Sequence, residues 1–159
     1  MSPRSAIKSR RRAPSCMKPY ESWLIKAYHD LISAKKLARD EEPVLDTAIY
    51  HTQQCAEKAL KAYLSYKQQP PQKSHNLRLL VELCQEIDET FAELLDDAEE
   101  LSPFATAYRY PDIIMEPDAQ EVEVAAKQAE KIFDFVRQKV PLSDEVIAKI
   151  TGTIVRTGG

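Results

Sequence analysis

The sequence predicts an all-α fold: an up-and-down antiparallel bundle of four to five helices, plus a short helix near residues 103–109. From Tyr20 to Val140, apolar residues recur at the three- and four-residue spacing of amphipathic helices. No stretch before residue 149 shows a comparable alternation of apolar and polar residues, the pattern typical of strands. Only 3 of the 159 residues are glycine, and all three lie at position 152 or later. A glycine-rich phosphate-binding loop is therefore excluded from residues 1–151.

The length and composition indicate one domain. With 43% hydrophobic and 30% charged residues, the chain has the composition of an average globular domain. Its 159 residues leave no room for two well-formed cores. No run approaches the ~18 apolar residues of a membrane span. We therefore expect one helical bundle over residues 19–141, with no membrane association.

The cysteines and histidines form no disulfide or metal motif. The 3 cysteines are odd in number, and their spacing fits neither a disulfide framework nor a zinc site. The 3 histidines, His29, His51 and His75, are too far apart in sequence for two of them to share one turn of a helix. These patterns predict a cytoplasmic protein with no metal and no other cofactor.

The charges are unevenly distributed. Residues 1–18 are rich in arginine and contain no acidic residue, so all 25 acidic residues lie in the remainder of the chain. We expect residues 1–18 to be a disordered basic arm, with an organelle transit peptide and a true start at Met17 as alternatives. The acidic remainder argues against broad binding of duplex nucleic acid, which needs a large basic surface.

The first two helices precede a link that contains Pro70 and Pro71. The first is expected at about residues 20–40, where small and aromatic side chains fall on one face. Asp46 is the expected N-cap of the second, which extends to about residue 67 and is rich in alanine. Such small side chains permit neighbouring helices to approach closely.

Two shorter helical stretches come next. Ser74 is the expected N-cap of a third helix, and a fourth stretch follows at about residues 88–100. Ser102, followed by proline, fits the N-cap of a short helix over residues 103–109. Pro111 ends that helix, because proline cannot continue the hydrogen-bond pattern.

The last long helix begins after Pro117 and Asp118 and ends before Pro141. Its apolar residues keep helical spacing throughout. Residues 142–159 are expected to be a C-terminal tail, which adds a final helical turn or a short strand before a frayed end.

A polar stripe is predicted on the second helix. His51, Gln54, Lys58 and Lys61 are spaced by three and four residues, so they share one side of the helix. Amides and an imidazole can bond base edges, and lysines can bind phosphates, so the stripe is a candidate nucleotide or nucleic-acid surface. The alternative is a solvated face whose His51 and Gln54 bond neighbouring helices.

Two further positions have the chemistry of a nucleotide site. His75 follows the expected helix cap, where a helix N-terminus attracts anions, although hydrogen bonding at the helix end is an alternative role. Arg109 lies between Tyr108 and Tyr110, where the chain must leave a helix before Pro111. A guanidinium can hold a phosphate and an aromatic ring can stack on a base, whereas the alternative is an ion pair across the bundle. The candidate nucleotide-binding residues are thus Arg109, Tyr110, His51, Gln54, Lys58, Lys61 and His75.

Three motifs occur in order along the chain: His51-x-x-Gln54-x-Ala56-Glu57-Lys58-x-Leu60-Lys61-Ala62, then Ser74-His75-Asn76-Leu77, then Arg109-Tyr110-Pro111-Asp112. Together they resemble the HEPN domain (higher eukaryotes and prokaryotes nucleotide-binding) over about residues 20–140. The resemblance implies an up-and-down bundle that forms a homodimer and binds a nucleotide or RNA. It also implies a nucleotidyltransferase-like partner protein in a toxin–antitoxin-like pair.

The resemblance also implies an enzymatic alternative. Many HEPN members are metal-independent ribonucleases in which an Arg is followed four to six residues later by a His, at a dimer-interface cleft. Arg109 matches that Arg, but Ile113, Ile114, Met115 and Glu116 stand where the His would be. We therefore assign no catalytic residue, and we favour binding of a nucleotide or RNA over RNA cleavage. The alternatives are a ribonuclease that uses a histidine from elsewhere in the chain, and a purely structural dimerisation bundle.

Overall fold

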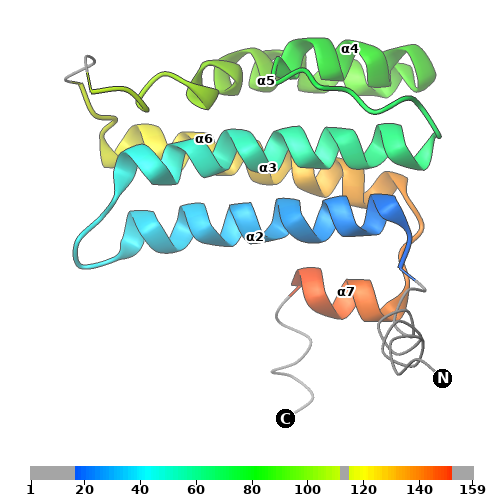
Figure 1. Cartoon of the computed structure of the whole chain (residues 1–159), viewed down its shortest axis with the longest axis horizontal. Coiled ribbons are helices and arrows are strands. Elements are labelled where there is room, and N and C mark those ends of the chain that lie inside the picture. The colour runs from blue at the N-terminus through cyan, green and yellow to red at the C-terminus, as the bar shows by residue number, and fades with distance from the viewer. Residues whose placement is uncertain (1–16, 112–114, 152–159) are drawn as a thin grey trace, which may run out of the picture.

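The computed structural model describes residues 17–111 and 115–151, which form an all-α bundle as the sequence predicts (Figure 1). No strand occurs within these two ranges. Within the described part, six α-helices and two 3₁₀ helices follow one another: α2 (Pro19–Arg39), α3 (Leu45–Tyr66), α4 (Leu77–Ile87), η1 (Glu89–Leu94), α5 (Leu95–Leu101), η2 (Ser102–Ala105), α6 (Ala119–Lys139) and α7 (Asp144–Thr151).

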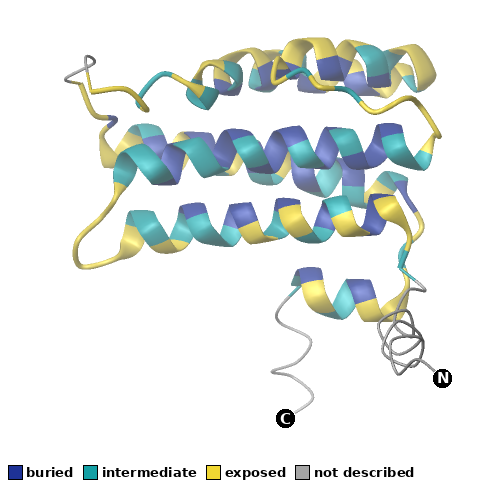
Figure 2. Cartoon of the chain, viewed as in Figure 1, coloured by how far each residue is buried: buried dark blue, intermediate teal, exposed yellow. Residues whose placement is uncertain are grey.

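Helix α3 lies at the centre of the bundle. It contacts α2 on one side, α4 and α5 on another, and α6 behind it in the view of Figure 1. All 22 residues of α3 are buried or half-buried (Figure 2). Many of its fully buried side chains are small and let the backbones approach closely: Ala48, Cys55, Ala56, Ala59 and Ala62. The alanine-rich second helix of the sequence is therefore the main core element.

The start of α3 differs from the expected one. Val44, and not Asp46, is its N-cap residue, and no side chain caps the helix. The Val44 amide donates to the carbonyl of Leu37 at 3.0 Å, and this contact turns the chain so that the helix begins at Leu45. Asp46 lies in the first helical turn, where its carboxylate accepts a hydrogen bond from the Thr47 amide at 2.7 Å.

The start of α4 also differs from the expected one. Asn76 is the N-cap, and its side-chain oxygen accepts a hydrogen bond from the Leu79 amide at 3.2 Å. Ser74 lies two residues earlier and accepts from the Asn76 amide at 3.0 Å instead. Both residue types are good caps, and the extended backbone of Asn76 decides which one begins the helix.

The region between α4 and α6 is less regular than expected. Asp88 has an extended backbone that ends α4, and the next stretch is a 3₁₀ helix followed by the short α5. The short helix expected over residues 103–109 is instead the 3₁₀ helix η2, which has Leu101 at its N-cap position and no side-chain cap. The Ser102 hydroxyl, the expected cap, accepts from the Leu77 amide at 3.1 Å. Because η2 ends at Ala105, Arg109 lies in the turns that follow it.

The last two helices complete the bundle. Helix α6 begins after Asp118, as expected, and the Asp118 carboxylate accepts from the Glu121 amide at 2.7 Å. Helix α7 packs on α2 through its buried residues Val146 and Ile150. Residues 1–16 of the expected basic arm and residues 152–159 of the expected tail lie outside the described residues. In the described part of the chain, no helix combines the length and apolar character needed to cross a bilayer.

Candidate functional site

A buried carboxylate from α2 holds two residues of the polar stripe on α3. Asp30 accepts a hydrogen bond from Nδ1 of His51 at 2.7 Å and, on its other oxygen, from Nζ of Lys58 at 2.6 Å. The Asp30 side chain is only 9% exposed, whereas the His51 and Lys58 side chains are each about a quarter exposed. The stripe therefore reaches solvent with its basic groups and is anchored on the buried acid.

A second carboxylate, Glu57 of α3, holds two more of the predicted residues. It accepts from Nζ of Lys61 at 2.9 Å and from Nδ1 of His75 at 3.0 Å. Gln53 donates both to Glu57 and to the backbone carbonyl of His75, at 3.2 and 3.1 Å. The Glu57 side chain is 6% exposed, but the His75 side chain is 70% exposed. His75 thus presents an imidazole to solvent from a fixed point beside α3.

Both acids are kept ionised by their partners. Burial by itself raises the pKa of Asp30, but the hydrogen bonds from His51 and Lys58 and the charge of Lys58 outweigh it and lower the pKa below the usual aspartate value. Burial likewise opposes ionisation of Glu57, and the hydrogen bonds from Lys61, His75 and Gln53 lower its pKa. Each acid therefore remains a hydrogen-bond acceptor at neutral pH.

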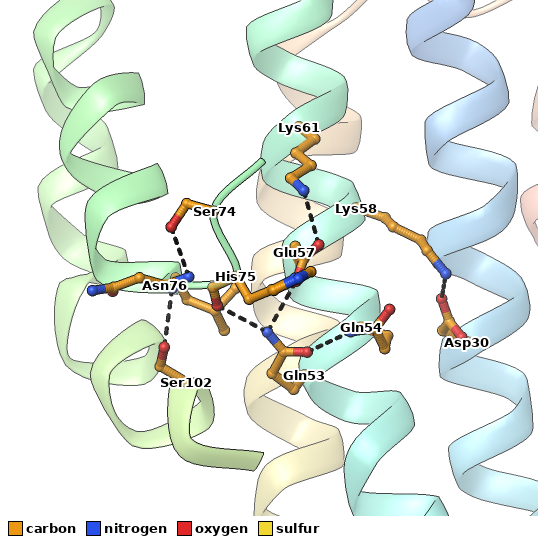
Figure 3. A network of polar contacts seen from close by, with 11 residues as sticks. Asp30, Gln53, Gln54, Glu57, Lys58, Lys61, Ser74, His75, Asn76 and Ser102 are labelled. Atoms are coloured by element: carbon orange, nitrogen blue, oxygen red, sulfur yellow. Dashed lines mark hydrogen bonds and ion pairs between the residues drawn. The ribbon is translucent and has the colours of Figure 1, made fainter. Parts of the chain in front are cut away.

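Gln54 lies between the two carboxylate clusters. Figure 3 shows Lys58 reaching sideways to Asp30 on α2, while Glu57 and Lys61 face the segment before α4 that carries His75. The Gln54 amide donates to the side chain of Gln53 at 2.7 Å. The structure thus brings five predicted residues, His51, Gln54, Lys58, Lys61 and His75, to one polar face of α3.

Arg109 lies at the N-terminal end of this face. Its guanidinium carbon is 3.9 Å from the ring centroid of Tyr50, a cation–π contact, and the Tyr50 ring meets the His51 ring edge to face at 5.6 Å. The Tyr108 hydroxyl donates to Glu121 of α6 at 2.8 Å and holds the segment in place. No carboxylate of residues 17–111 and 115–151 forms an ion pair with Arg109, so the expected alternative of a pair across the bundle is not observed there.

Tyr110, the remaining predicted residue, is 57% exposed. Within the described residues, its ring stacks on no other aromatic ring. Among the described residues, no ring contact joins Tyr110 to the α3 face.

Three residues of this face were not among the predicted ones: Asp30, Tyr50 and Glu57. The spacing of Tyr50 and Glu57 from Gln54, four and three residues, is a helical signal that could have placed both beside the stripe. Asp30 gives no such signal, because it reaches the stripe from another helix. For the described residues, no cluster of three or more His, Cys, Asp or Glu side chains could hold a metal ion.

Residues 20–139 match the model of the HEPN domain family. The chain belongs to the HEPN domain family. Two solved structures are similar to this HEPN domain. The protein TT1696 from Thermus thermophilus has 28% identity and a TM-score of 0.67, covering 78% of this chain and 100% of its own. ST0689, described as an archaeal HEPN homologue, has 25% identity and a TM-score of 0.62, covering 79% and 100%. Among curated proteins, none matches this chain.

Family membership and the observed fold agree. The HEPN match spans α2 to α6, the helices that build the polar face and its supports. The chain is thus an all-α HEPN domain, and its polar face lies within the matched region.

Proposed function

We propose that this HEPN domain binds RNA or a nucleotide at the polar face of α3, with Arg109 as the main phosphate ligand. One observation carries the proposal: the Arg109 guanidinium rests on the Tyr50 ring at 3.9 Å and is not engaged by a carboxylate of the described residues. A guanidinium that is stacked but not ion-paired keeps its donors available for an incoming phosphate, which it can bind with two parallel hydrogen bonds.

The rest of the face supports recognition beyond the phosphate. Lys58 and Lys61 each share a carboxylate with a histidine, so their charges are largely balanced within the face. Gln54 and the exposed His75 offer hydrogen-bonding groups of the kind that read base edges. The face therefore combines one cation that is not ion-paired, Arg109, with polar groups that can hydrogen-bond to bases.

The test is a binding titration with Arg109→Ala beside the unchanged protein. We expect the affinity for a labelled single-stranded RNA, measured by fluorescence anisotropy in EDTA, to fall at least about tenfold in this variant, because a charge-assisted contact is lost. Arg137→Ala is the matched control, since Arg137 lies on α6 and pairs with Asp134. Equal affinity for Arg109→Ala and the unchanged protein would contradict the assignment.

We also propose that the domain acts as a homodimer with a nucleotidyltransferase-like partner, in a toxin–antitoxin-like pair. The HEPN membership supports this proposal, because the resemblance implies both associations. Light scattering coupled to size-exclusion chromatography tests the dimer: a mass twice the 18.1 kDa of the chain is expected. A mass of one chain at all concentrations would exclude the homodimer.

RNA cleavage is a second candidate function, which the Asp30–His51 pair favours. Because ionised Asp30 can only accept, it holds the proton on Nδ1 of His51 and leaves Nε2 of a neutral ring as the acceptor that a general base needs. Incubation of labelled RNA in EDTA tests this candidate. Cleavage that disappears in His51→Gln, while binding remains, would support it, and intact RNA would exclude it.

A further inference from the structure

A straight row of side chains follows α3 beside the stripe. Tyr50, Gln54, Glu57 and Lys61 are spaced by four, three and four residues, so they lie along one line of the helix. Figure 3 shows Gln54, Glu57 and Lys61 following one another along this line. The row connects the Arg109 end of α3 with its C-terminal end.

Each end of the row pairs a cation with an aromatic ring. At the first end, Arg109 lies 3.9 Å from the centroid of Tyr50. At the other end, Nζ of Lys61 lies 5.9 Å from the ring centroid of Trp23 on α2. Base-stacking rings and cations are combined in proteins that bind single-stranded nucleic acid. Because Lys61 is ion-paired with Glu57 at 2.9 Å, the Trp23 end offers chiefly a ring, whereas the Arg109 end offers a cation as well.

The Trp23 end also contains a hollow. Its volume is about 110 Å³, and its lining includes Trp23, Lys61, Leu64, Pro70 and Pro71. This volume is well below the roughly 300–1,000 Å³ of pockets that enclose a drug-sized ligand. The hollow can therefore receive a flat ring against Trp23, but it cannot enclose a whole nucleotide.

The two ends are too far apart for one nucleotide. The separation of 11 residue steps between Tyr50 and Lys61 corresponds to about 16 Å of helix, at ~1.5 Å per step. Stacked nucleotides repeat every ~3.4 Å along one strand, so about five would cover this length, and an extended strand would need fewer. A ligand that uses both ends must be an oligonucleotide.

The middle of the row tolerates a phosphate backbone. Glu57 is the acid in the row, but it is 6% exposed and its two oxygens are covered by Lys61 and His75. His75, which is 70% exposed, therefore faces the solvent side of that acid. A strand that passes over Glu57 would meet the exposed His75 imidazole before it meets the carboxylate.

We propose that the hollow at Trp23 is a base-stacking subsite, and that the ligand is a single-stranded RNA of about three to five nucleotides that runs along α3 from Arg109 to Trp23. This inference rests on the function proposed above and adds the class of ligand and a second contact point. A duplex is not a ligand of this kind, because its bases are already stacked and paired.

Trp23 is the single tryptophan of the chain, so the tryptophan fluorescence of the protein reports directly on the proposed subsite. The unchanged protein is titrated with AMP, with a pentaadenylate and with a duplex of the same length, while tryptophan fluorescence is recorded. We expect the pentaadenylate to quench the emission, whereas AMP, which is expected at the Arg109 end, and the duplex should cause no quenching at the same concentration. Binding of labelled pentaadenylate by anisotropy, without any change in tryptophan emission, would overturn the subsite.

Variants provide a second measurement. Trp23→Phe keeps an aromatic face and should bind pentaadenylate within about threefold of the unchanged protein, whereas Trp23→Leu should bind it about 5- to 100-fold more weakly, the cost of one lost base stack. The affinity for AMP should be the same in Trp23→Phe and Trp23→Leu, because AMP is expected to bind at the Arg109 end. Tyr28→Leu is the matched control, because Tyr28 is a half-buried aromatic of α2 that contacts Phe133 of α6 instead.

The outcomes separate this inference from the proposed function. If pentaadenylate affinity depends on Arg109 but is equal in Trp23→Leu and the unchanged protein, the subsite is wrong and the proposed function stands. If neither AMP nor pentaadenylate binds the unchanged protein, both are wrong.

Discussion

Asp30 and His51 join the two helices that pack most extensively in this protein. Nδ1 of His51 on α3 lies 2.7 Å from one oxygen of Asp30 on α2, while Lys58 binds the other oxygen at 2.6 Å. One buried acid thus fixes the orientation of an imidazole and an ammonium group on the polar face. The same contact contributes to the stability of the bundle and to the geometry of the candidate site.

Removal of this acid should destabilise the protein. In Asp30→Ala, His51 and Lys58 lose their shared partner, and we expect the free energy of unfolding to fall by about 1–3 kcal/mol, because partly buried polar groups lose their hydrogen bonds. Urea denaturation at pH 7 measures the change. Asp134→Ala, which removes an exposed i,i+3 pair with Arg137, should cost no more than about 1 kcal/mol. Equal losses in the two variants would contradict a special role for Asp30.

Acid should weaken the fold through the same groups. The pKa values of Asp30 and Glu57 are lowered in the folded protein, below 3.8 and 4.5. A group with a lowered folded pKa stabilises the fold above its unfolded pKa, and that contribution is lost as the pH falls towards the folded value. Stability should therefore decline as the pH falls below about 5.

Urea midpoints at pH 6, 5, 4 and 3 test this pH dependence. Asp30→Asn with Glu57→Gln should be less stable at pH 6 and should lose less stability on acidification than the unchanged protein. A residual decline is expected from Asp88, whose hydrogen bonds from Thr90 and Lys139 lower its pKa to about 2. An undiminished decline in the double variant would show that the two acids do not carry the effect.

The ring of Tyr50 should matter to ligand binding through Arg109. Tyr50→Ala removes the surface on which the guanidinium rests, so the arginine loses its preferred position. We expect RNA affinity to fall about two- to fivefold, the size of a cation–π contact at an accessible site. Tyr50→Phe keeps the ring and should bind as well as the unchanged protein. Anisotropy titrations compare the three, and equal binding by Tyr50→Ala would remove Tyr50 from the site.

The two buried cysteines should resist thiol reagents. Burial raises the pKa of both Cys55 and Cys84, in the latter case to about 12, so neither forms the reactive thiolate at neutral pH. With Cys16→Ser as the starting protein, labelling by DTNB at pH 8 should be slow in buffer and fast in urea. Rapid labelling in buffer would show that the core around α3, where Cys55 faces α6 and Cys84 faces α3, opens easily.

The helices could be predicted because their signals are local. The apolar repeat and the prolines located α2, α3 and α6 to within a residue or two of the observed ends. Caps were harder, because two good capping residues often lie close together. Ser74 and Asn76 are both suitable, and the choice depends on the backbone at Asn76 and on the contact between Ser102 and the Leu77 amide.

The polar face could be predicted only in part. The stripe from His51 to Lys61 follows from helical spacing on one element, and in the structure all four of its residues lie on α3. The acids that hold them could not all be found this way. Asp30 lies on a different helix, and its contact with His51 depends on how α2 packs against α3. Likewise, the contact of Arg109 with Tyr50 depends on where η2 ends.

The extensive burial of α3 has a consequence for how this domain can change over evolution. Since every residue of α3 is buried or half-buried, most substitutions on it also change a contact with a neighbouring helix. New ligand preferences are then easier to acquire in the segments that border the face, residues 70–76 and 106–110, which are mostly exposed. An engineer who wishes to retarget the domain should therefore diversify these two segments and leave the central helix unchanged.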